Sequence, residues 1–259
     1  MISGIGGDGG AGALTRRLDR PEAVLLAVAQ AGVAAVGWLV DPFWVAVIVA
    51  TQLALGGLGA VRVMGPAQEG TGLARYAMPA TAGVAATLFG RVLPGGLSVL
   101  LVPLVAVLLW AVIYVELRRA RTSGGRTILE LLLTATLLAA ATGVLGLFGD
   151  VAWPTPVAAI AVFALPLALR SAESRGSLGG GAVGQALLHV LAVAQAGTAA
   201  LLLDLPGVAT VPALMALAFY AWAGAAQALA DGEQGRSVAV EFGALVVLGI
   251  VVAFLLHRG

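Results

Sequence analysis

The sequence LAVAQAG occupies residues 26–32 and returns unchanged at residues 191–197. Each copy lies inside a long apolar segment, and each is followed by an Asp near a Pro, at Asp41 and at Asp204. This pattern predicts one membrane hairpin that the chain uses twice. Because Ala, Leu, Val and Gly dominate the composition, short identities between apolar segments also arise by chance, and a true duplication requires a sustained period.

The composition as a whole indicates a membrane protein. Hydrophobic residues make up 60% of the 259 residues and charged residues only 10%, whereas about 25% of the residues in soluble globular domains are charged. A chain in lipid must satisfy its backbone hydrogen bonds within helices or a closed barrel. The apolar runs are continuous rather than alternating, which excludes a barrel. The sequence therefore predicts an all-α, polytopic bundle of transmembrane helices.

Two residue types are absent, and each absence excludes a class of chemistry. All fourteen basic residues are Arg, so no Lys is present to form a retinal Schiff base. The chain has no Cys, which excludes disulfides, thiol catalysis and thiolate metal sites. The Arg bias, with abundant Ala, Gly and Val, suggests a GC-rich genome, and we expect a protein of the bacterial cytoplasmic (inner) membrane. No cofactor and no nucleic-acid partner are predicted.

The first twenty residues differ from the rest of the chain. Residues 1–20 are Gly-rich at the start and basic at the end, and we expect a flexible cytoplasmic tail that leads into a retained signal anchor. Residues 21–259 are expected to form a single membrane domain. G-x-G-x-x-G occurs at residues 4–9 and 179–184. Neither copy follows a strand, which is the context that dinucleotide binding requires.

Nine segments approach or reach the length of about 20 apolar residues that a bilayer core requires. They are residues 21–40, 43–63, 76–93, 97–116, 127–148, 153–169, 182–203, 208–229 and 237–257. The third and sixth are short and carry Pro. Short, interrupted segments in matching positions are typical of transporter binding sites. Pro near a helix start is also simply tolerated there, so both interpretations stay open.

The distribution of Arg predicts the orientation, because cytoplasmic loops collect basic residues. With the N-terminus inside, twelve Arg residues lie in the cytoplasm, and only Arg91 and Arg258 lie outside. The tight outer turns carry Asp41, Asp150 and Asp204 instead. The two LAVAQAG segments then run in the same direction. Two schemes fit this arrangement: a hairpin copied several times with a ninth helix added, or three blocks of three helices in alternating orientation.

Carboxylates within the spans are candidate functional groups, because a charge at the centre of a membrane helix costs about 2.5–3.5 kcal/mol on insertion scales. Glu116 ends the fourth span beside Arg118 and Arg119, and an interfacial ion pair is expected there. Glu130 follows Arg126 by one helical turn, which predicts either a snorkelled surface pair or a functional carboxylate. Glu241 lies about one turn into the ninth span, with no basic residue one turn away.

His189 is the histidine that lies well inside a span, and Gln185 precedes it by one turn. It is either hydrogen-bonded between packed helices or serves as a proton relay or solute ligand. The other histidine, His257, is predicted at the opposite membrane surface, which argues against a bis-histidine haem. One buried His is too few for the usual zinc ligand sets, so no metal site is predicted.

Gln30, Gln52 and Gln195 are predicted near mid-membrane, where an amide needs a protein partner because hydrocarbon offers none. They either hold helices together or line a polar cavity. We expect permease-like binding and translocation of a small solute, with the candidate residues Gln30, Gln52, Gln195, Gln185, His189, Glu130 and Glu241. One alternative is a non-catalytic membrane subunit that packs against a partner or a second copy. Another is an intramembrane lipid-modifying enzyme, which requires His189 and Glu130 or Glu241 to converge.

Overall fold

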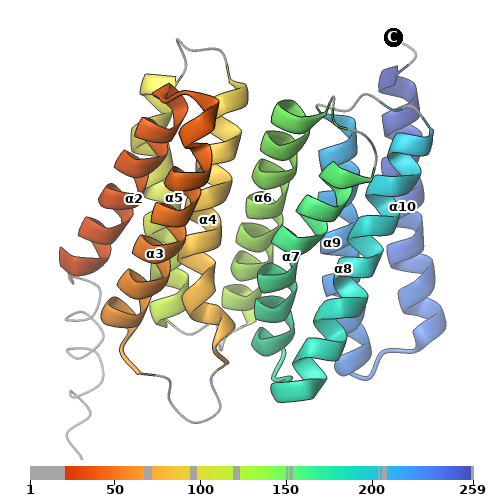
Figure 1. The fold of residues 1–259 in the computed structure, drawn as a ribbon. Coiled ribbons are helices and arrows are strands. Elements are labelled where there is room, and N and C mark those ends of the chain that lie inside the picture. The colour runs from red at the N-terminus through yellow and green to blue at the C-terminus, as the bar shows by residue number, and fades with distance from the viewer. Residues whose placement is uncertain are drawn as a thin grey trace, which may run out of the picture.

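The computed structural model describes residues 21–66, 72–93, 98–118, 123–149, 151, 154–203, 205 and 209–257. Within these residues the chain forms nine long α-helices, one short 3-10 helix and no strand (Figure 1). The predicted all-α bundle is confirmed. The expected tail at residues 1–20, and Asp150 and Asp204 at two of the expected outer turns, lie outside the described residues.

Each predicted span corresponds to one helix. The helices are α2 (Pro21–Leu39), α3 (Val45–Met64), α4 (Ala74–Val92), α5 (Ser98–Arg118), α6 (Ser123–Phe148), α7 (Thr155–Ser174), α8 (Gly179–Leu202), α9 (Thr210–Ala230) and α10 (Gly235–His257), and the 3-10 helix η1 (Pro42–Trp44) precedes α3. The largest difference is at the end of α7. The predicted sixth span ends at residue 169, and this boundary is wrong: residues 170–174 continue the helix, and α4, α5 and α6 supply partners for the side chains of Glu173, Arg170 and Ser171.

Successive helices cross the bundle in opposite directions (Figure 1). Helices α2, α4, α6, α8 and α10 begin at the lower end in that view, which we call the N-terminal face; α10 ends at the opposite end, the C-terminal face. Nine crossings place the two ends of the described chain on opposite faces, as predicted. That the N-terminal face is cytoplasmic remains a prediction from the Arg distribution.

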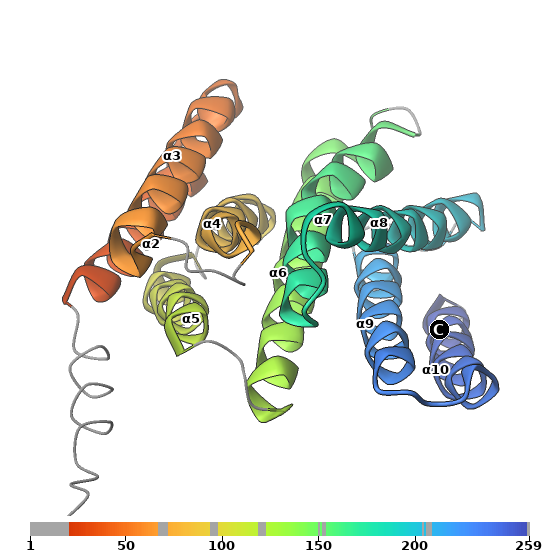
Figure 2. The ribbon, with the colours of Figure 1, turned by 90° about the horizontal axis from the view of Figure 1, so that it is seen from below.

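The helices form two groups that α4 and α6 connect (Figure 2). One group contains α2, α3, α4 and α5, and the other contains α7, α8, α9 and α10. Helix α4 packs against α2, α3, α5, α6 and α7, so it is the central helix of the bundle. Helix α10 lies at the far edge and packs against α9.

Helix α4 is both the most buried helix and the least typical span. Thirteen of its 19 residues are buried, including Arg75, Thr81 and Thr87. The other eight long helices of the described chain are long and apolar enough to cross a membrane, and α4 is not among them. Since protein rather than lipid surrounds α4, its surface does not have to match hydrocarbon. The bundle thus contains eight apolar helices and a more polar central one.

The interrupted helices considered for the third and sixth spans are not found. Helix α4 continues through Pro79 in its second turn, and α7 continues through Pro166. Pro156 stands in the first turn of α7, where the missing N–H has no intrahelical acceptor in any case. Pro in these segments is therefore accommodated within continuous helices.

The two LAVAQAG copies lie on α2 and α8, which run in the same direction, as predicted (Figure 1). Their buried faces differ. Gln30 is fully buried, whereas its counterpart Gln195 is exposed; Val28 is 54% exposed, whereas its counterpart Val193 is fully buried. Identical sequence does not give equivalent packing at these two positions in the bundle.

Candidate functional site

Two of the three predicted mid-membrane glutamines, Gln30 on α2 and Gln52 on α3, form hydrogen bonds with α4. Gln30 and Gln52 are both fully buried. The side-chain amide of Gln30 donates a hydrogen bond to the carbonyl oxygen of Pro79 at 2.9 Å. The amide of Gln52 donates to the backbone carbonyl oxygen of Gln30 at 2.9 Å and to the hydroxyl of Thr87 at 3.3 Å. The two side chains therefore tie α2 and α3 to α4 and to each other.

Two glycines provide the space for these amides. A Cβ atom at Gly83 would lie 2.6 Å from Oε1 of Gln52 and 2.8 Å from Nε2 of Gln30. A Cβ atom at Gly56 would lie 2.4 Å from Cα of Ala80. The three helices can thus approach closely only because these positions lack side chains.

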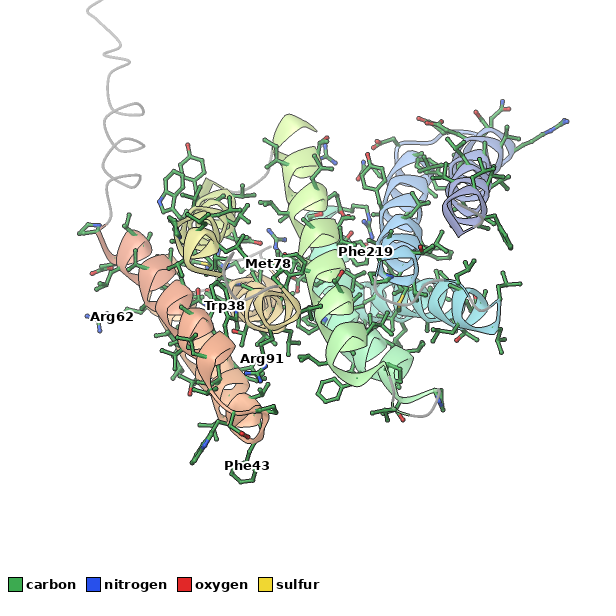
Figure 3. All side chains as sticks on the ribbon, turned by 90° about the horizontal axis from the view of Figure 1, so that it is seen from above. Trp38, Phe43, Arg62, Met78, Arg91 and Phe219 are labelled. Carbon is green, nitrogen blue, oxygen red and sulfur yellow. The ribbon has the colours of Figure 1, made fainter. Side chains whose placement is uncertain are left out.

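His189 lies between α8 and α9 and is completely buried. Its Nε2 atom is 2.8 Å from the carbonyl oxygen of Phe219, and its ring stacks on the Phe219 ring with the centroids 4.0 Å apart. The other ring nitrogen, Nδ1, has no partner within the described chain. The contacts fix both the position and the plane of the imidazole. Phe219 is the α9 side chain labelled in Figure 3.

The remaining candidates on α8 and α10 face outward. Gln185, Gln195 and Glu241 are all exposed, because α8 buries its other face against α7 and α9, and α10 packs on α9. They do not join His189 or Glu130. Among the described side chains, no hydrogen bond or ion pair joins His189 to Glu130 or Glu241, the contact that the enzyme hypothesis requires.

Glu116 and Arg170 form a buried ion pair that the sequence interpretation did not predict. Nε of Arg170 lies 2.7 Å from Oε1 of Glu116, and Nη2 lies 2.7 Å from Oε2. The two side chains are 0% and 12% exposed. The side chains of the expected partners, Arg118 and Arg119, lie outside the described set. The actual partner comes from α7, which reaches Glu116 because it continues beyond its expected end.

Glu130 also pairs with α7, and the expected pair with Arg126 is wrong. Its Oε1 accepts a hydrogen bond from the hydroxyl of Ser171 at 2.7 Å and lies 3.4 Å from Nη1 of Arg175. Nη1 of Arg175 donates to Ser171 at 2.5 Å. Oε2 of Glu130 and Nη2 of Arg175 have no partner within the described residues. Burial lowers the pKa of Arg175 from its ordinary value, and the Glu130 carboxylate opposes this shift.

The sequence interpretation therefore missed three residues at the end of α7 that contact the candidate carboxylates: Arg170, Ser171 and Arg175. Ser171 and Arg175 are four residues apart and share one face of a helix, as their hydrogen bond confirms. That spacing was readable in the sequence. Spacing alone does not show that polar residues after an apolar run continue the helix.

Both ends of α4 are held by charged side chains. The Glu173 carboxylate accepts hydrogen bonds at 3.1 and 3.2 Å from the N–H of Ala74, the first residue of α4, where a helix favours negative charge. Near the other end, Arg91 donates to the carbonyl oxygens of Gly37 and Val40 at the end of α2 (Figure 3). This contact explains why an Arg stands on the otherwise Arg-poor C-terminal face.

A cavity of about 230 Å³ lies near the N-terminal face between α6, α7 and α9, and we call it the α6–α9 pocket. Its polar lining includes Arg126, Glu130, Ser174, Tyr220, Gln227 and Asp231. It thus combines charges of both signs with neutral hydrogen-bonding groups. Small-molecule sites typically have a few such groups to orient the ligand. Of the seven predicted site residues, Glu130 borders this pocket.

Two further cavities are almost entirely apolar. One, of about 160 Å³, lies between α4, α5 and α6 and is lined by residues such as Phe89 and Leu104. Another, of about 530 Å³, lies between α9 and α10 and is lined by residues such as Leu214 and Leu245. Neither has a charged side chain among its lining residues, so neither provides a charge to orient a polar solute.

In the described part of the chain no group of three or more His, Asp or Glu side chains is placed to hold one metal ion. The side chain of His257 lies outside that part. Comparison of the chain with protein-family models, with curated proteins and with solved structures finds no match.

Proposed function

We propose that this integral membrane protein is permease-like and binds a small polar solute in the α6–α9 pocket. The main support is the unpaired carboxylate oxygen of Glu130. Its carboxylate lines the pocket, and its Oε2 atom is buried without a hydrogen-bond partner among the described residues. Buried polar atoms in proteins nearly always have a partner. A hydrogen-bond donor on a bound solute would supply it, and binding would be the first step of transport.

The roles of the other candidates follow from their contacts. Gln30 and Gln52 bond to the backbone and to Thr87, so in this proposal they hold the bundle together rather than bind solute. His189, stacked on Phe219, maintains the packing of α8 on α9. These contacts leave Glu130 as the predicted residue with a binding role.

The cysteine-free chain allows a direct test of access to the pocket. Ser174→Cys places a single thiol in the lining. A membrane-impermeant thiol reagent added at the N-terminal face should label it, and a bound solute should slow the reaction. Leu178→Cys in the exposed α7–α8 loop is the positive control, and Ala186→Cys, at a fully buried position on α8, is the negative control. If the loop thiol reacts and Ser174→Cys stays protected in folded protein, the pocket is closed to solute and the proposal fails.

A second function, that of a membrane subunit, is supported by the outward polar residues. Gln195 and Glu241 are exposed within the apolar helices α8 and α10, where lipid offers no hydrogen bonds. A partner helix against this surface would provide them. Gln195→Cys should then form cross-links to a partner or second copy in native membranes, and Leu25→Cys, an exposed apolar position on α2, should not. Equal cross-linking at both positions would indicate random collision.

A further inference from the structure

The pairing of Glu130 with α7 affects a second residue, Arg126. Arg126 lies one turn before Glu130 on α6, about 6 Å along the helix axis, and lines the same pocket. Glu130 would be its natural partner, but Ser171 and Arg175 occupy the Oε1 atom of that carboxylate. Within the described chain Arg126 forms no ion pair. Its guanidinium therefore brings an unmatched positive charge to the pocket wall.

The α9 side of the pocket carries an unmatched negative charge. Asp231, just after α9, lines the pocket and accepts a hydrogen bond from the side-chain amide of Gln227 at 2.8 Å. No ion pair of Asp231 occurs in the described residues. Glu130 and Arg175 neutralise each other, so the charges left for a ligand are one positive group on α6 and one negative group beside α9.

We infer that the α6–α9 pocket binds a small zwitterion, whose anionic group pairs with Arg126 and whose ammonium group pairs with Asp231. This inference rests on the proposed function and names the class of its solute. A planar guanidinium binds carboxylate and phosphate groups through two parallel hydrogen bonds. Tyr220 belongs to the same lining, and aromatic rings attract ammonium groups.

The balance of charges favours a zwitterion over a simple ion. A purely anionic ligand would leave Asp231 unmatched and would be repelled by it, and a purely cationic ligand would meet the same difficulty at Arg126. The volume of about 230 Å³ suits a molecule with the two charged groups on a short carbon link. Such a molecule is either a free solute of the amino-acid or phosphoethanolamine type, or the headgroup of phosphatidylethanolamine from the adjacent leaflet.

The first experiment measures binding to the full-length protein, purified in detergent and stripped of lipid. Isothermal titration calorimetry compares O-phosphoethanolamine and glycine with two probes that carry charge of one sign only, the cation ethanolamine and the anion inorganic phosphate. At least one zwitterion should bind more tightly than both one-sign probes by about tenfold or more. Arg126→Gln and Asp231→Asn should each weaken that binding by about tenfold or more. Asp231 is exposed, so we expect Asp231→Asn to leave folding intact.

Two matched substitutions serve as controls. Arg236→Gln and Glu233→Gln remove exposed charges near the start of α10, outside the pocket lining, and should leave zwitterion binding unchanged. The second experiment identifies the source of the ligand. Native mass spectrometry of protein taken from nanodiscs should show retained phosphatidylethanolamine, lost in Arg126→Gln and not replaced by phosphatidylglycerol, if the ligand is a headgroup. Binding of only the free zwitterions identifies a soluble ligand.

Two results would overturn the inference. One is that neither zwitterion nor phosphatidylethanolamine binds, although Ser174→Cys is labelled; this outcome rejects the zwitterion while leaving the solute pocket in place. The other is binding that Arg126→Gln and Asp231→Asn weaken no more than the two control substitutions do. Protection of Ser174→Cys, in contrast, would reject the proposed function itself.

Discussion

The guanidinium of Arg170 donates two hydrogen bonds to the carboxylate of Glu116, and both N–O distances are 2.7 Å. The two side chains come from α7 and α5, helices that have almost no direct backbone contact with each other. The ion pair therefore links the two helix groups at a place where backbone packing does not.

Removing one partner of this pair should destabilise the protein strongly. Glu116→Ala leaves a buried, uncompensated guanidinium, and we expect a loss of about 3–5 kcal/mol in the free energy of unfolding. The double variant Glu116→Ala/Arg170→Ala should lose less than the sum of the two single variants. Unfolding in mixed micelles measures these values, with Glu241→Ala as an exposed control. Strict additivity would mean that the two side chains do not interact.

The repeated heptad provides a matched pair of substitutions. Gln30→Leu removes the hydrogen bond to Pro79 in the interior and should cost about 1–2 kcal/mol of unfolding free energy. Gln195→Leu changes the same residue in the same local sequence, but on an exposed surface, and should cost little or nothing in detergent. Equal losses for the two variants would contradict the difference in burial between α2 and α8.

Neighbouring glycines on α3 should respond in opposite ways to the same substitution. A Cβ at Gly56 meets the backbone of Ala80 at 2.4 Å, whereas a Cβ at Gly57 has nothing within 4 Å. Gly56→Ala should therefore destabilise the bundle by about 1–3 kcal/mol, and Gly57→Ala should be neutral or slightly stabilising because Ala is the better helix former. Thermal unfolding of the purified variants distinguishes the two. A harmless Gly56→Ala would show that α3 and α4 are not in close contact.

The orientation can be measured with two exposed positions on opposite faces. Phe43 lies in η1 on the C-terminal face, and Leu178 lies between α7 and α8 on the N-terminal face. With the N-terminus in the cytoplasm, an impermeant thiol reagent should label Phe43→Cys in intact cells and Leu178→Cys only after the membrane is opened. The reverse labelling would refute the orientation predicted from Arg, without changing the fold.

The helices were predictable because hydrocarbon imposes a minimum length and apolar character on each span. All nine appeared close to their expected positions, and alternation of direction followed from their number. The rotation of each helix about its axis was not predictable. Most of these helices are apolar on all sides, so no polar stripe marks the face turned to lipid. Gln30 and Gln195 have identical neighbours, and only tertiary contacts decide which one is buried.

The ion pairs were unpredictable for a related reason. Glu130 has a basic residue one turn away in Arg126, and local spacing alone favours that pair. Ser171 and Arg175 contact Glu130 instead, because α7 continues past its apolar part and packs beside α6. Pairs separated by more than 40 residues depend on which helices become neighbours, and a single sequence does not contain that information.

The polar character of α4 has a consequence for how the protein is made. Helices leave the ribosome in order, and α4 is less apolar than the other eight long helices of the described chain, so we expect it to enter lipid less readily by itself. The α2–α3 hairpin is synthesised first and carries the Gln30 and Gln52 amides that bond to α4. We therefore expect the insertion of α4 to depend on the α2–α3 hairpin, and variants of that hairpin that lack these amides should lower the fraction of chains in which α4 spans the membrane.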